Sequence, residues 1–188
     1  MKVRWLGNSC VEIFGGYHIL IDPNYLVEPE KTPDLVLVTH EHDDHFDPED
    51  FEKIDGEFEL LAPKPTLDKF DIDGIEVEPG MYIKDVKVLD CQCWKAEESV
   101  SYHYKGVLHS GDSNVFPDVD DVKILFTACF PDYYEDYISA AIRLDADLVV
   151  PFHYDLKEGT EEPKRLVELM EEENIQAKII EPGESVDI

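Results

Sequence analysis

Short apolar runs separated by turn residues dominate the first two thirds of the chain. Alternating and β-branched apolar side chains in such short runs are typical of strands rather than of amphipathic helices. The run at 34–39, Asp-Leu-Val-Leu-Val-Thr, is apolar enough to form a buried strand. Gly15-Gly16 predicts a hairpin turn between two strands. The expected strands in this part cover residues 2–6, 9–14, 17–21, 34–39, 58–61, 74–77, 81–83, 86–91, 99–104, 106–109 and 122–126.

Helical spacing appears mainly in the last third. Asp47 followed by Pro48 predicts one short helix earlier, at 48–54, because Asp is a good helix cap and Pro fits the first turn. The last third predicts helices at 132–143 and 162–173 and strands at 148–151 and 177–180. Strands therefore run through the whole chain without a regular strand–helix–strand alternation. This order favours an α+β (α/β) fold of two packed β-sheets with helices outside over a Rossmann sheet.

Length and charge limit the possible partners. The 188 residues, 43% of them hydrophobic, predict one folded domain over 1–188. The 44 acidic residues against 16 Lys and Arg give a net charge of −28, which repels nucleic acid and anionic membranes. A bound metal ion can reverse the potential locally, so a small anionic substrate remains compatible with this charge. The sequence thus predicts a small-molecule substrate, with neither nucleic acid nor membrane as partner, and is compatible with a homo-oligomer.

The sequence also predicts a cytoplasmic protein. It contains no apolar run near the roughly 18 residues that a membrane span needs, and its N-terminus shows no signal-peptide pattern. Its four cysteines, Cys10, Cys91, Cys93 and Cys129, are too few and too irregularly spaced for a disulfide framework. We therefore expect reduced cysteines.

The segment at 39–45, Thr-His-Glu-His-Asp-Asp-His, carries the clearest chemistry. Three His and two Asp follow a buried strand within six residues, and both residue types bind zinc, iron or manganese. Two later apolar strands also end in a ligand-type residue, namely Asp112 and His153. Either residue alone is more often structural, but three such strand ends together predict a metal site.

These segments resemble the metallo-β-lactamase superfamily, in particular its small Zn-dependent hydrolases related to L-ascorbate-6-phosphate lactonase. The resemblance covers nearly the whole chain and rests on five segments: 5–10 (Trp-Leu-Gly-Asn-Ser-Cys), 19–23 (Ile-Leu-Ile-Asp-Pro), 40–45 (His-Glu-His-Asp-Asp-His), 110–113 (Ser-Gly-Asp-Ser) and 151–154 (Pro-Phe-His-Tyr). It implies a four-layer αββα sandwich with the metals at one edge, between the sheets.

The resemblance also implies the roles of individual residues. The implied metal ligands are His40 and His42 for the first ion, Asp44, His45 and His153 for the second, and Asp112 as the bridge. Asp44 would also orient the attacking water, and Asp22 would hydrogen-bond a ligand histidine unless it only caps its strand. The expected cofactor is zinc, at one or two ions per chain, with manganese or iron as alternatives.

One ligand position departs from the family pattern. Members of the family carry a third histidine for the first metal at the end of the strand that here reads Val-Leu-Asp-Cys-Gln-Cys-Trp-Lys (88–95), which contains no His. By position, Lys95 or Trp94 stands where the ligand is expected, and a protonated Lys is a poor ligand. Cys91 or Cys93 could supply a thiolate, unless both are simply small buried residues. Otherwise water completes a weak first site, and Lys95 serves as a catalytic residue that faces an anionic substrate group.

The function expected from these observations is metal-dependent hydrolysis. A metal-bound hydroxide would attack a small, anionic ester, lactone or phosphoester. The alternative is a non-catalytic metal-binding or ligand-binding domain with a degenerate first site, suggested by the missing histidine and by Asn8, where relatives often carry His. The complete second ligand set favours catalysis.

Overall fold

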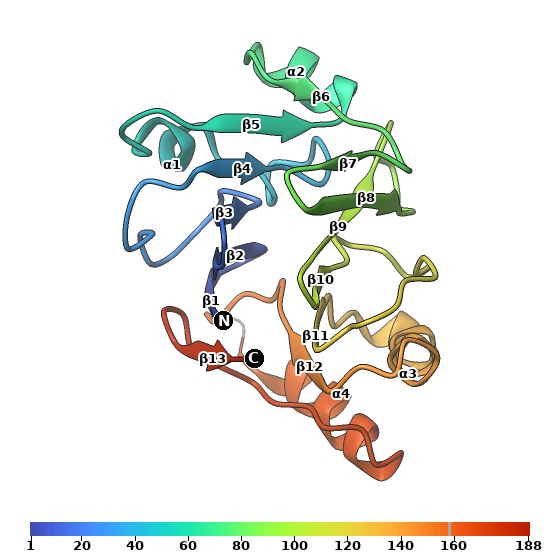
Figure 1. Cartoon of the computed structure of the whole chain (residues 1–188). Helices are drawn as coiled ribbons and strands as arrows, with labels where there is room; N and C mark the ends of the chain where they lie inside the picture. Colours follow the sequence, from blue (N-terminus) through green and yellow to red (C-terminus); the bar gives the residue numbers. More distant parts are fainter. Residues whose placement is uncertain (158) are drawn as a thin grey trace.

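Two β-sheets packed face to face form the centre of the computed structural model, which describes residues 1–157 and 159–188 (Figure 1). The first sheet has the strand order β13-β1-β2-β3-β4-β5-β6. Its strands are β1 (Lys2–Gly7), β2 (Cys10–Phe14), β3 (His18–Ile21), β4 (Leu35–Leu37), β5 (Glu59–Ala62), β6 (Ile75–Glu76) and β13 (Ser185–Asp187).

The second sheet has the order β12-β11-β10-β9-β8-β7. Its strands are β7 (Tyr82–Ile83), β8 (Val86–Asp90), β9 (Val100–Tyr104), β10 (Val107–His109), β11 (Ile124–Thr127) and β12 (Leu148–Pro151). Both sheets mix antiparallel hairpins with a parallel part, which is β3-β4-β5-β6 in one and β10-β11-β12 in the other.

Helices cover the outer faces of both sheets (Figure 1). They are α1 (Pro48–Glu52), α2 (Lys64–Phe70), α3 (Tyr134–Arg143) and α4 (Glu161–Glu172). Side chains of α1 and α2 pack on β4 and β5, whereas those of α3 and α4 join the main core beside β11 and β12. The layers are therefore helix, sheet, sheet and helix, as expected for the metallo-β-lactamase sandwich. Among the described residues, no helix is long and apolar enough to cross a membrane.

Strand β4 shows how the sequence pattern produces these layers. Leu35 and Leu37 point into the core between the sheets, whereas Val36 packs under the helices with Phe46. Because successive side chains of a strand point to opposite faces, a continuous apolar run is needed where both faces are covered. This is the physical reason that the run at 34–39 predicts a buried strand.

The structure corrects four details of the predicted elements. The strand expected at 177–180 is wrong, because only one isolated bridge forms there, between Val149 and Ala177. Helix α2 was not predicted, since two prolines at 63 and 65 obscure its start, and neither was β13, a polar edge strand that pairs with β1 through its backbone. The helix expected at 132–143 begins at Tyr134, after a 3-10 turn over Pro131–Tyr133. Asp47, by contrast, caps α1 as predicted.

The parallel strands bring their carboxyl ends to one edge of the sandwich. Ile21 pairs with Leu37 and His109 pairs with Phe126, so the loops that follow these strands start at matching heights. Backbone hydrogen bonds join the two sheets at this edge, from Val100 N to Thr39 O at 3.0 Å and from His153 N to Asn8 O at 2.9 Å. Residues far apart in sequence therefore meet at a fixed edge.

Candidate metal centre

Asp22 anchors the histidine-rich loop that follows β4. One carboxylate oxygen accepts a hydrogen bond from Thr39 N at 2.7 Å, and the other accepts one from Thr39 Oγ1 at 2.8 Å. His45 Nδ1 lies 2.7 Å from the same second oxygen. Asp22 is fully buried and ends β3, so it connects one strand to the loop of its neighbour. The hypothesis that Asp22 orients a ligand histidine agrees with this geometry.

The partners of His45 and His40 fix which ring nitrogen of each faces the site. His45 donates from Nδ1 to Asp22, which leaves Nε2 directed at Asp112, 3.0 Å from its Oδ1. His40 Nδ1 lies 3.0 Å from Thr39 Oγ1, which leaves its Nε2 free in the same way. A ligand histidine is commonly held by such a hydrogen bond from its other nitrogen. Thr39 was not singled out from the sequence, although it directly precedes the motif.

Backbone conformation places the two remaining strand-end residues. Gly111, just before Asp112, has φ +57°, and a Cβ there would lie 3.3 Å from Thr39 Cβ. A glycine is therefore required for the turn to approach the motif loop. His153 itself has φ +60°, which is uncommon for a bulky residue and is often found at functional sites.

One group of side chains suited to a metal ion, called the second group because it would hold the second ion, consists of Asp44, His45 and His153. Their ligand atoms lie within 4.8 Å of one another. His153 Nε2 lies 3.2 Å from Asp44 Oδ2 and 3.6 Å from Asp112 Oδ1. The buried atoms His45 Nε2, His153 Nε2 and Asp112 Oδ1 make no well-aligned hydrogen bond to any residue the structure describes. Buried polar atoms without partners are costly, so a cation between them is a physical explanation for their arrangement.

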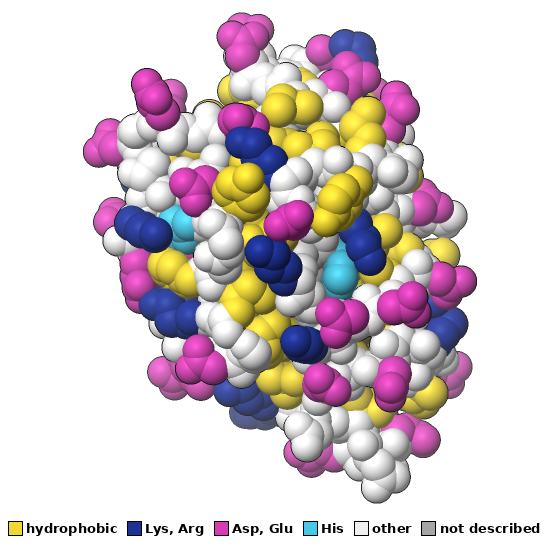
Figure 2. Space-filling model, in the orientation of Figure 1, with side chains coloured by type: hydrophobic (Ala, Val, Ile, Leu, Met, Phe, Trp, Pro, Cys, Tyr) yellow, Lys and Arg dark blue, Asp and Glu magenta, His cyan; other side chains and the backbone are white. Residues whose placement is uncertain are grey.

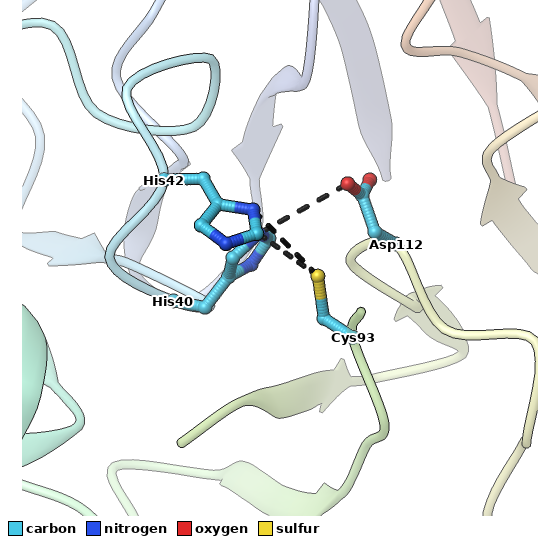
Figure 3. Close-up of side chains that lie close together, drawn as sticks. All are labelled: His40, His42, Cys93 and Asp112. Atoms are coloured by element: carbon cyan, nitrogen blue, oxygen red, sulfur yellow. Dashed lines mark hydrogen bonds and ion pairs between the residues drawn. The ribbon is translucent and has the colours of Figure 1, made fainter. Parts of the chain in front are cut away.

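The other such group, called the first group because it would hold the first ion, consists of His40, His42, Cys93 and Asp112 and is shown in Figure 3. Cys93 Sγ lies 3.4 Å from His40 Nε2 and 3.8 Å from His42 Nδ1. The histidines come from the loop after β4, the cysteine from the loop after β8 and the aspartate from the loop after β10, and all four side chains point toward one another (Figure 3). A group of two imidazoles, one thiol and one carboxylate suits zinc.

Asp112 belongs to the group that contains Cys93 and also faces the other group. Its Oδ1 faces His45 and His153, whereas its Oδ2 lies 4.0 Å from His40 Nε2. One carboxylate oxygen is therefore directed at each set of histidines, which is the arrangement needed to bridge two cations.

The histidines and carboxylates shift one another's protonation. Burial lowers the pKa of His40 to about 3, so its ring is neutral and can donate a lone pair at neutral pH. The interaction with His153 lowers the pKa of Asp44 to about 2. Burial opposes ionisation of Asp112, but His45 and His153 outweigh it and lower its pKa. Burial likewise disfavours protonated His45, yet the carboxylates of Asp112 and Asp22 outweigh it and raise its pKa well above 6.5. Metal binding must therefore displace a proton from His45.

A cavity of about 620 Å³ opens onto both groups. Its lining also includes Trp94, Lys95, Asn114, Phe130 and Tyr133. Lys95 Nζ lies 3.9 Å from the centre of the Trp94 ring. On the face drawn in Figure 2, acidic side chains are spread around the periphery and Lys and Arg side chains lie scattered among them rather than in one basic patch. Among the described residues that line the cavity, Lys95 is the only lysine or arginine.

The structure brings together all six predicted ligand residues. Their role as ligands stays a prediction, as does the catalytic role of Asp44 and of Lys95, which lies in the cavity wall and outside both ligand groups. Of the two cysteines, Cys91 is buried with Sγ 3.3 Å from Ser110 O, whereas Cys93 joins the first group. Asn8 contributes its backbone oxygen to His153 N.

Comparisons with known proteins agree with this geometry. A family model described as "Beta-lactamase superfamily domain" matches residues 2–153. A UPF0173 metal-dependent hydrolase from Methanoculleus marisnigri is 27% identical over an alignment of 228 positions, which covers 100% of this chain and 97% of the relative.

Two solved structures have the same fold. A putative metal-dependent hydrolase from Parabacteroides distasonis superposes with a TM-score of 0.78 at 18% identity, covering 94% of this chain and 91% of the other. Igni18, a metallo hydrolase from Ignicoccus hospitalis, gives a TM-score of 0.75 at 21% identity, covering 98% and 97%.

Proposed function

The chain belongs to the β-lactamase superfamily and is a metal-dependent hydrolase of the metallo-β-lactamase fold, and we propose that it hydrolyses a small anionic ester, lactone or phosphoester at a dinuclear metal site. The observation that carries this proposal is the position of Asp112. Its two carboxylate oxygens face two separate groups of histidines, and three buried atoms there lack other partners. Residues His40, His42 and Asp112 would hold one ion, and Asp44, His45, His153 and Asp112 the other.

Divalent ions held by these residues would supply Lewis-acid chemistry, which polarises the bond under attack and lowers the pKa of a bound water molecule. The chain's own residues would supply the remaining steps. Asp44 stays ionised at neutral pH, and its side chain is 57% exposed, so a carboxylate oxygen can accept a hydrogen bond from the attacking water and orient it. Asp22 and Thr39 would keep the lone pairs of His45 and His40 directed inward throughout.

Lys95 supports the preference for an anionic substrate. It lies in the wall of a cavity that otherwise carries Asp44, Asp112 and Asp132, and its ammonium group can attract a carboxylate or phosphate. Replacing Lys95 with Gln should raise KM for anionic substrates and leave bound metal unchanged. An unchanged KM for anionic substrates in K95Q, or an equal rise in KM for neutral substrates, would contradict this role.

The alternative of a non-catalytic domain is less well supported. A site that had lost its function would be expected to lose donors from either group, yet both groups have three or more potential donors facing one another.

The direct test is a hydrolysis screen on zinc-loaded protein with panels of small lactones, phosphoesters and carboxylic esters. We expect turnover in the wild type and a loss of at least ~100-fold in Asp112→Ala, which removes the bridging carboxylate. Asp43→Ala is the matched control, since Asp43 is an aspartate of the neighbouring histidine-rich loop but its side chain is 85% exposed and pairs with Lys69. Unchanged turnover in Asp112→Ala, or an equal loss in Asp43→Ala, would contradict the proposal.

A further inference from the structure

We propose that Cys93 is the third protein ligand of the first metal, so that this ion is held by two imidazoles, a thiolate and the bridging Asp112 and must be thiophilic, with zinc preferred over manganese or magnesium. This inference rests on the proposed dinuclear site and specifies the chemistry of one half of it. Three candidate side chains lie within the segment 91–95, and the sequence alone leaves Cys91, Cys93, Lys95 and water open.

Distances separate Cys93 from the other candidates. For zinc–nitrogen bonds of about 2.0–2.1 Å and a zinc–sulfur bond of about 2.3 Å in a tetrahedron, the nitrogen and sulfur atoms lie about 3.6 Å apart. The two observed separations, 3.4 Å to His40 Nε2 and 3.8 Å to His42 Nδ1, lie on either side of that value. The group therefore has near-ligand spacing, as Figure 3 shows.

The other candidates are directed elsewhere. Cys91 Sγ is buried against Ser110 O at 3.3 Å. Lys95 is exposed and its ammonium group lies over the Trp94 ring. Cys91 does not belong to the group that contains His40 and His42.

The loop that carries Cys93 is fixed by its own hydrogen bonds. Ser99 Oγ accepts from Cys93 N at 3.2 Å and donates to Cys91 O at 2.9 Å. Gln92 N donates to Ser113 Oγ at 3.2 Å, and Glu97 N donates to Glu41 Oε1 at 2.6 Å, which ties the loop to the histidine-rich loop. Cys93 is thus held in place by protein contacts, and only the Sγ–H bond must break on coordination, with its proton released to solvent as the sulfur–metal bond forms.

A thiolate among nitrogen and oxygen donors changes which ion is preferred. Soft sulfur ligands favour zinc over manganese or magnesium, which prefer carboxylates and water. The second group, with two imidazoles and carboxylates only, carries no such bias.

Cobalt absorption tests the proposal without reference to activity. Cobalt bound to a thiolate gives an intense near-ultraviolet charge-transfer band that cobalt bound to imidazole and carboxylate lacks. Protein stripped of metal and loaded with two cobalt ions per chain should show this band in the wild type and in Cys91→Ser, the matched control. The band should be absent in Cys93→Ser. Cys93→His should retain two cobalt ions without the band, because it restores a nitrogen donor.

The outcomes separate this inference from the dinuclear proposal. Two bound cobalt ions without the band in the wild type, or a band that survives in Cys93→Ser, would overturn Cys93 as ligand and leave the dinuclear site standing. Failure of the wild type to bind cobalt at all would contradict the metal site itself. A band that is lost in Cys91→Ser but kept in Cys93→Ser would identify Cys91 as the thiolate ligand and overturn the proposal.

Discussion

The two groups of candidate ligands differ in how firmly the scaffold holds them. In the second group, His45 is fully buried and tied to Asp22, and His153 is fixed through its backbone to Asn8. Each group has one fully buried histidine and also more exposed members, which are His42 and Cys93 in the first group and Asp44, with a side chain that is 57% exposed, in the second. Among the described ligand residues, however, only His45 is held through its other ring nitrogen by a buried carboxylate, that of Asp22. Because ligands positioned in advance bind a metal at a lower entropic cost, we expect the second group to retain its ion more tightly. The same edge of the sandwich would then hold one firmly bound ion and one exchangeable ion.

The largest expected effect that tests this comparison comes from removing one histidine of each group. His45→Ala should weaken binding of the second ion by more than ~100-fold. Loss of a residue that only hydrogen-bonds a metal ligand lowers metal affinity by up to about 100-fold, and loss of the ligand itself should cost more. His42→Ala should release the first ion and spare the second. Metal analysis after dialysis measures both, and loss of the same ion in both variants would contradict the division into two groups.

Asp22 gives a smaller and more specific test. Asp22→Asn keeps an acceptor for Thr39 N but loses the charge that holds His45, so affinity for the second ion should fall by about 10-fold to 100-fold. Affinity for the first ion should change less. Competition with a chromophoric chelator measures the two constants, and an equal fall in both would show that Asp22 only supports the fold.

The pH dependence of stability should reveal His45 in the metal-free protein. Its folded pKa is raised above the ordinary value of about 6.5 by Asp112 and Asp22, despite burial. The resulting stabilisation is fully present below about 6.5 and is lost as the pH rises through the raised pKa. Urea unfolding between about pH 6 and pH 9 should therefore show a steeper decline in the metal-free wild type than in His45→Gln. Identical slopes for the two proteins would contradict the shift.

The smallest expected effect concerns Ser99. Ser99→Ala removes the hydrogen bond that holds Cys93 N, which contributes about 0.5–1.5 kcal/mol, together with the bond from Ser99 Oγ to Cys91 O. Affinity for the first ion should fall by roughly tenfold at most, while the second ion is unaffected. Calorimetric zinc titration checks this, and weaker binding of the second ion would argue against a local role.

The sequence predicts the strands and the grouping of the candidate ligands better than it predicts the loops. The six candidate ligands follow apolar strands, and the parallel pairing of these strands brings them to one edge. The choice among Cys91, Cys93 and Lys95 depends on how the loop after β8 turns, which Ser99 and Ser113 determine through contacts distant in space. Strand β13 and the single bridge at Ala177 likewise depend on pairing partners rather than on local pattern.

The number of metal ions in the purified, untagged protein tests the central claim most directly. Inductively coupled plasma mass spectrometry after zinc loading and extensive dialysis should give two ions per chain, one for each group that Asp112 faces. A chain that holds one ion or none under these conditions would contradict the dinuclear site.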